Sequence, residues 1–164
     1  MRIANANYRS MQLDKFTDYA LRVLMTLAVR APARVPTSEI AAVFALSENH
    51  LSKVATQLVR EGFVTSVRGR NGGLVLARPS DEIVVGNVVR AMKRNDPVVA
   101  CFGTDKSCLI LPVCGLRTPL ALAQEAFFAT LDRYTLADIT RSQGALGALL
   151  EMRTDNEEPR QHTH

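Results

Sequence analysis

The strongest constraint on the fold is a succession of three amphipathic helical segments separated only by short breaks. Apolar residues recur at about 3.6-residue spacing, which predicts helices over Thr17–Arg30, Thr37–Phe44 and Glu48–Arg60. Ser47 is a favourable N-cap for the third helix, and the two residues before it leave room only for a tight turn. The sequence therefore predicts one helix followed by a helix-turn-helix unit.

A short hairpin follows the third helix. Phe63–Val67 and Leu74–Ala77 have the β-branched and apolar content of strands. Between them Arg68–Gly73 reads Arg-Gly-Arg-Asn-Gly-Gly, a run that tolerates positive φ and favours a turn. Three helices and a hairpin with an arginine-rich tip are the pattern of a winged helix-turn-helix. We therefore expect a mainly α fold with a small β-hairpin.

Fewer elements are predicted in the second half. We expect a helix over Val85–Met92, no regular structure over 94–115, a long helix over Leu116–Tyr134 and a short helix over Leu136–Thr140. The long helix carries an apolar stripe that fits either a core or a subunit seam. The predicted units are a winged helix-turn-helix domain at 11–93, a cysteine loop at 94–115, a long helix with a C-terminal helix at 116–150, and tails at 1–10 and 151–164.

Composition places the chain among ordinary globular proteins. Its 164 residues are 47% apolar and 22% charged, which suits one domain with a core. No apolar run approaches the roughly 18 residues that a membrane span needs. The first residues lack the apolar segment of a secretory signal, so we expect a cytoplasmic protein whose three cysteines stay reduced.

Positive charge is concentrated in the first half. Residues 1–90 hold 12 Lys and Arg against 7 Asp and Glu, a net charge of +5, whereas residues 91–164 carry −1. A major groove about 12 Å wide admits one helix, and a thin arginine-bearing hairpin fits a narrow minor groove. The candidates for contact with double-stranded DNA are Ser47, Asn49, His50, Ser52, Lys53 and Gln57 on the third helix and Arg68, Arg70 and Asn71 at the hairpin tip.

Each of these features also has a structural explanation. The polar helix face could be a solvated surface, and the hairpin tip a plain turn or a phosphate-binding nest. Their order along the chain, within the basic half, favours DNA binding over these alternatives. An enzyme is not expected, because two of the three histidines, His162 and His164, lie in the tail and no Ser–His–acid or paired-carboxylate grouping is evident.

The three cysteines form a second candidate site. Cys101, Cys108 and Cys114 are separated by six and five residues, whereas zinc sites favour pairs with two to four residues between ligands. Thiolates at wider spacing suit an iron–sulfur cluster, with one coordination position left for another ligand. Three thiols that are buried or have no function are the alternative, since free cysteine is among the most buried residue types.

Four segments resemble the NsrR and IscR family of iron–sulfur transcription regulators, over nearly all of the chain from Met11 to about Leu150. They are Met11–Arg22 (MQLDKFTDYALR), Ser47–Val54 (SENHLSKV), Val67–Gly73 (VRGRNGG) and the three-cysteine loop. Three shorter features are most similar to the NsrR branch, the nitric-oxide-sensing repressors: the Phe-Thr-Asp segment, the Asn-His pair of the third helix and the Tyr-Thr-Leu-Ala-Asp stretch that starts at Tyr134.

This resemblance implies a homodimer with the long helix as its seam, and a cluster at the three cysteines, with four irons and four sulfurs (4Fe–4S) favoured over two and two. It also implies that Asp18 of the partner subunit completes the coordination. A carboxylate is a more exchangeable iron ligand than a thiolate, which would leave one iron open to a small molecule. The alternative at Asp18 is a carboxylate that stabilises the first turn of its own helix.

The resemblance further implies a repressor that releases its operator when nitric oxide destroys the cluster. A regulator of the same fold that senses iron or redox state uses the same thiols and stays open as an alternative. A zinc-stabilised DNA binder and a small iron–sulfur electron carrier are further alternatives.

Overall fold

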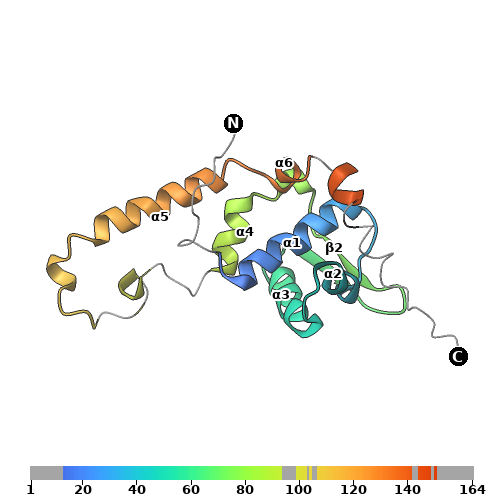
Figure 1. Ribbon diagram of the computed structural model, residues 1–164, viewed down its shortest axis with the longest axis horizontal. Helices are drawn as coiled ribbons and strands as arrows, with labels where there is room; N and C mark the ends of the chain where they lie inside the picture. Colours follow the sequence, from blue (N-terminus) through green and yellow to red (C-terminus); the bar gives the residue numbers. More distant parts are fainter. Residues whose placement is uncertain are drawn as a thin grey trace, which may run out of the picture.

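The computed structural model describes residues 13–93, 99–102, 104, 107–141, 144–148 and 150. Figure 1 shows a helical body from which one long helix projects to the side. The predicted tails, and parts of the predicted cysteine loop, lie outside the described residues. The elements in chain order are α1 (Lys15–Arg30), α2 (Thr37–Phe44), α3 (Glu48–Arg60), β1 (Val64–Val67), β2 (Gly73–Leu76), η1 (Ser80–Glu82), α4 (Val85–Met92), η2 (Ala100–Phe102), η3 (Leu111–Val113), α5 (Arg117–Leu131) and α6 (Leu136–Ile139).

One hydrophobic core joins α1, α3 and α4 with the hairpin. The apolar stripe predicted for the third helix is buried, with Leu51, Val54 and Leu58 at 0% exposure. They pack in one cluster with Leu24 and Leu27 of α1. Because this stripe faces inward, the opposite side of α3 faces solvent.

The first helix begins two residues earlier than predicted because Asp14 caps it. The Asp14 carboxylate accepts hydrogen bonds from the backbone N–H of Thr17 at 2.8 Å and from the Thr17 hydroxyl at 2.7 Å. Lys93, just after α4, lies 3.7 Å from the same carboxylate. Burial opposes ionisation of Asp14, but the bonds from Thr17 and the charge of Lys93 outweigh it and hold its pKa below the ordinary value of 3.8.

The hairpin is confirmed, and the structure adds a third strand position to it. β1 and β2 pair antiparallel with Val67 opposite Gly73. Val35, from the connection between α1 and α2, forms an antiparallel bridge with Leu74 through backbone bonds of 3.1 and 2.9 Å. A Cβ on Gly73 would lie 2.9 Å from the carbonyl carbon of Val35, so this close approach requires glycine. We call residues 64–76, with this added strand position, the wing.

The long helix is confirmed but ends at Leu131 rather than at Tyr134. The chain turns there because the backbone N–H of Val85 donates to the carbonyl of Tyr134 at 2.9 Å, and Leu136 N–H donates to Ile83 O at 2.7 Å. These bonds bring α6 back against the body. The expectation of no regular structure over 94–115 was wrong in part, since η2 and η3 lie within it.

An ion pair fixes the base of α5 to α4. Both guanidinium nitrogens Nη1 and Nη2 of Arg90 lie 2.6 Å from the carboxylate oxygens of Asp132, and Arg90 also stacks over the ring of Phe128 at 4.6 Å. The hydrogen bond from Arg90 lowers the pKa of Asp132, and burial only partly opposes this. None of the described helices has the length and apolar content needed to cross a membrane.

The cap of α1 generates a stability prediction. We expect Asp14→Ala to lower the free energy of unfolding by about 1 kcal/mol at neutral pH, the usual contribution of an N-cap. Asparagine also caps helices, so Asp14→Asn should retain most of this stability. Urea denaturation followed by circular dichroism measures both variants.

The pH dependence separates the charge of Asp14 from its capping bond. Its pKa is depressed in the folded chain, so the carboxylate stabilises the fold above pH 3.8 and this contribution is lost as pH falls through the lower folded pKa. The stability difference between the wild type and Asp14→Asn should therefore shrink below pH 3.8. A constant difference across that range would contradict the assignment.

Candidate nucleic-acid interface and cysteine segment

The solvent face of α3 carries the predicted DNA-contacting side chains. Ser47, Asn49, His50, Ser52 and Lys53 are all exposed, and they lie opposite the buried apolar stripe. Because this face is polar and the helix is rigidly packed, it can enter a major groove without exposing the core.

The side chains of Ser47 and Gln57, two of the predicted DNA-contacting residues, differ from the sequence prediction in their hydrogen bonds or exposure. Ser47 occupies the N-cap position of α3, but its side chain makes no capping hydrogen bond. Gln57 is half-buried, and its side-chain amide donates to the carboxylate of Glu61 at 2.9 Å. This bond uses one of the two N–H donors of the amide, so Gln57 can contact a base edge without breaking it.

The wing tip presents its arginines on a narrow turn. Arg68, Arg70 and Asn71 are exposed, and Gly72 N–H donates to Gly69 O at 2.9 Å to close the turn. Gly69 has φ of +113°, a conformation that L side chains rarely adopt. The tip is therefore thin, basic and held in one turn geometry, which suits insertion beside a phosphate backbone.

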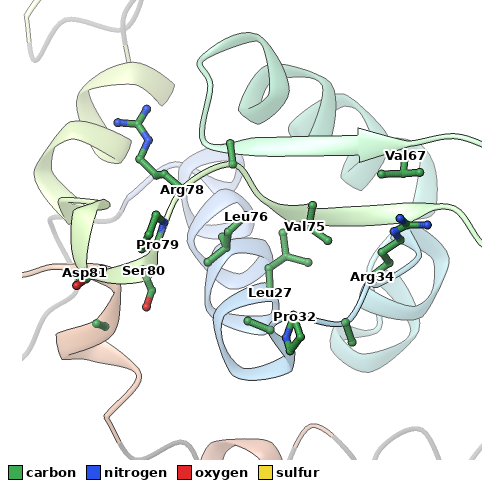
Figure 2. Close-up of a pocket in the computed structure, with 14 residues that line it drawn as sticks. Leu27, Pro32, Arg34, Val67, Val75, Leu76, Arg78, Pro79, Ser80 and Asp81 are labelled. Atoms are coloured by element: carbon green, nitrogen blue, oxygen red, sulfur yellow. The ribbon is translucent and has the colours of Figure 1, made fainter.

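A third arginine at the wing was not identified from the sequence. Arg34 precedes the bridged residue Val35 and lines the same groove as Val67, the residue that leads into the wing tip. Figure 2 shows Arg34 at one end of this groove and Arg78 at the other, with apolar residues between them. No periodicity marks a single strand position, so the sequence placed Arg34 in a break between helices.

The cysteine segment lies apart from the core, between α4 and α5. Cys108 is exposed, and Cys101 and Cys114 are half-buried. Within the part of the chain that the structure describes, no group of three or more His, Cys, Asp or Glu side chains lies close enough to hold a metal ion. The structure therefore places the three cysteines in one segment but does not bring them together.

Asp18 is the predicted fourth ligand, and it has another partner in this chain. Its carboxylate forms an ion pair with Arg22, one turn along α1, with 2.8 Å between Oδ2 and Nη2, and both side chains are 41% exposed. The guanidinium of Arg22 also stacks over the ring of Phe44 at 5.4 Å. Asp18 thus occupies the first turn of its own helix, as the alternative expects, and it is also accessible on the surface.

Large apolar side chains around the cysteines face solvent. Leu109 is 94% exposed and Val113 is 83% exposed, and all residues of α5 are exposed or half-buried. Apolar surface of this kind is unusual on a monomer and marks an interaction site. On α5 the exposed side chains at positions 122, 126 and 129 are Leu, Ala and Ala, spaced by four and three residues and therefore on one helix face.

Known proteins that are similar to this chain are transcription regulators. The sequence profile of the Rrf2 family, described as an iron-dependent transcriptional regulator, matches residues 13–142. The HTH-type transcriptional regulator NsrR of Geobacillus kaustophilus (strain HTA426) is 45% identical over 145 residues, which span 87% of this chain and 99% of the relative. The NsrR of Bacillus subtilis (strain 168) is 40% identical over the same shares of each chain.

A solved structure shares the fold. The structure of CymR (YrzC), the global cysteine regulator of B. subtilis, superposes with a TM-score of 0.63 at 25% identity, over 80% of this chain and 98% of that one. The comparisons confirm the predicted winged helix-turn-helix fold and the predicted similarity to NsrR. They also confirm the role of a DNA-binding transcription regulator, which is not an enzymatic role.

The exposed wing tip generates a binding prediction. Arg68→Ala and Arg70→Ala should each weaken binding to a duplex that the wild-type protein selects from a random-sequence pool. Each should also flatten the plot of log affinity against log salt by about 0.9 for every phosphate that the variant no longer neutralises. Arg141→Ala is the matched control, because this arginine is 81% exposed but pairs with Asp138, outside the wing. A salt slope that stays unchanged in both wing variants would remove the wing from the interface.

Proposed function

The chain belongs to the Rrf2 family of iron-dependent transcriptional regulators, and from that premise we propose that it is a homodimeric repressor that responds to nitric oxide. In this proposal α3 and the wing bind the operator, and an iron–sulfur cluster is the cofactor. The 45% identity to a regulator named NsrR supports the nitric-oxide branch over sensors of iron or redox state.

One observation carries the proposal: the cysteine segment and the DNA-reading surface are separate parts of the chain, and packed helices connect them. The cysteines lie on an exposed segment between α4 and α5, and the base of α5 is fixed to α4 by Arg90 and Asp132. α4 packs against α1, and α1 packs against α3. A rearrangement of the segment can therefore change the position of α3 through contacts that are continuous.

The dimer is proposed from the unpartnered face of α5. No residue of this fully described 15-residue helix is buried, although its composition is mostly apolar. A helix of this kind is stable in water only when its apolar face packs against another surface. Small side chains at Ala126 and Ala129 allow close approach of a second helix, so a second copy of α5 is a suitable partner.

The donor set fits an iron–sulfur cluster by its chemistry. Three thiols are the soft ligands that such clusters require, and each is exposed or half-buried rather than enclosed in the core. Cys101, Cys108 and Cys114 would hold the cluster, with Asp18 of the partner subunit as the fourth ligand. When bound, the cluster supplies iron with which nitric oxide reacts. We favour the 4Fe–4S form over 2Fe–2S.

The ion pair of Asp18 links this site to the helix-turn-helix unit. Asp18 must leave Arg22 before its carboxylate can bind iron, and Arg22 stacks on Phe44 at the end of α2. The residue after Phe44, Ala45, has positive φ and forms the turn that leads to α3. A short series of contacts thus connects the Asp18 carboxylate to the turn that precedes the recognition helix.

The proposal is tested on protein purified without oxygen. The wild type should show visible absorbance of an iron–sulfur cluster, lose it when nitric oxide is added, and release its selected duplex in the same titration. Cys108→Ala should lack the absorbance and the gas response together. An iron chelator run in parallel separates nitric-oxide sensing from iron sensing. Colourless wild-type protein that holds DNA and ignores nitric oxide would contradict the proposal.

Asp18→Ala in the same experiment tests the fourth ligand. This variant should keep the absorbance, because the three thiolates remain. It should show changed nitrosylation kinetics and a shorter cluster lifetime, because the fourth ligand is lost. Asp14→Asn is the matched control, since it alters a carboxylate in the same part of the chain that has no proposed role in coordination. Kinetics equal to the wild type would remove Asp18 from the ligand set.

The proposed seam predicts the effect of one charge placed on each side of α5. Ala126→Glu places a carboxylate on the face shared with Leu122 and Ala129, and should shift the protein towards monomer because the charge would be buried. Ala121→Glu makes the same substitution on another face of the helix and should leave the dimer intact. Size-exclusion chromatography with light scattering measures both. Equal masses for the two variants would place the seam elsewhere.

A further inference from the structure

We propose that Arg34 contacts a DNA phosphate beside the wing and is a third arginine of the DNA interface. The inference rests on the proposed function, because it assumes that the wing binds duplex DNA. It concerns a residue outside the recognition helix and outside the turn between β1 and β2. Three observations carry it: backbone placement, exposure and the absence of a partner within the described chain.

The backbone places Arg34 on the wing and not in a loose connection. Val35 is held to Leu74 by two backbone hydrogen bonds, so Arg34 extends the wing as part of a third strand position. Because side chains alternate along a strand, the buried Val35 and its neighbour Arg34 face opposite sides. Arg34 therefore lies on the side away from the core, and it lines one groove with Val67 and Val75 (Figure 2).

This placement brings Arg34 next to the arginines of the tip. Val67 is the last residue of β1 and directly precedes Arg68. Arg34 therefore shares a groove with the residue that leads into the tip, where Arg68 and Arg70 follow. A phosphate backbone that follows the wing presents successive negative charges, which a row of arginines can neutralise.

Arg34 is available for such a contact. Its side chain is exposed, and within the described residues it makes no hydrogen bond or ion pair. An arginine whose role is structural has partners, as Arg78 at the other end of the groove shows. Arg78 donates to the carbonyl of Gly62 at 3.1 Å and stacks over Phe63 at 5.5 Å. The two arginines thus line the same groove and carry the same charge, but only Arg78 makes a hydrogen bond and a ring contact within the described residues.

The test compares these two arginines in the cluster-loaded, full-length protein. Affinity for the selected duplex and for an unrelated duplex is measured at several salt concentrations for Arg34→Ala, Arg34→Lys and Arg78→Ala. Arg34→Ala should reduce the salt slope by about 1.8, one phosphate on each protomer, on both duplexes. Its affinity deficit against the wild type should then shrink about tenfold between about 50 and 200 mM salt. Arg34→Lys and Arg78→Ala should keep the wild-type slope.

The outcomes separate the inference from the proposed function. An Arg34→Ala slope equal to that of the wild type, with tight wild-type binding, overturns the inference and leaves the proposed function intact. An equal fall in slope for Arg78→Ala also overturns it, because the effect would then be general charge. A wild-type protein that selects no duplex overturns both. The melting temperature of Arg34→Ala should match the wild type, since the side chain supports no contact in the fold.

Discussion

Burial of one face of α3 under α1 is the constraint on which the rest of the structure depends. Leu51, Val54 and Leu58 are each fully buried, and each contributes about 1.5 to 3 kcal/mol by leaving water. Any rotation of α3 that hid Asn49 or Lys53 would expose these side chains. The direction of the DNA-reading face is therefore a consequence of the core, and it requires no separate interaction to maintain it.

The wing and α5 are similar in that only one end of each is packed against the body, namely the strands of the wing and the C-terminal end of α5. The wing is held by Val64 and Leu74 in the core and by the bridge to Val35. α5 is held by Arg90 and Asp132, and its other end projects from the body (Figure 1). This arrangement presents basic and apolar surfaces on different parts of the molecule, so that DNA and a second subunit can be bound without competing for the same residues.

Local signals were sufficient for most of the fold. One boundary was misplaced although a local signal marks it, and another was misplaced where tertiary contacts decide. The boundaries of α2 and α3 follow from the periodicity of Ile40, Val43, Leu51 and Val54, so the sequence predicts them correctly. The cap at Asp14 is a local signal that was overlooked, although it lies directly before the first helical residues. The end of α5 was misplaced because the apolar pattern continues to Tyr134, whereas backbone bonds between distant segments divert the chain.

The candidate site divides in the same way. Exposure of the polar α3 face and of the wing tip follows from the pattern of apolar residues, which explains why those residues were found. The bond between Gln57 and Glu61 spans four residues of one helix and could have been anticipated. The position of Arg34 could not have been predicted from the sequence, because it depends on the pairing of Val35 with Leu74, which are far apart in the chain.

The energies of the contacts identify which part of the cysteine segment can drive the proposed switch. An ion pair as exposed as that of Asp18 and Arg22 contributes about 0 to 1 kcal/mol, so breaking it alone changes little. Shifting a two-state regulator from 99:1 to 1:99 requires about 5.5 kcal/mol. Leu109 and Val113 are almost fully exposed in the single chain, and each could contribute about 1.5 to 3 kcal/mol on burial. With two copies of the segment in a dimer, apolar docking is large enough to set the subunit arrangement. The metal ligands would then act by deciding whether the segment keeps the shape that docks.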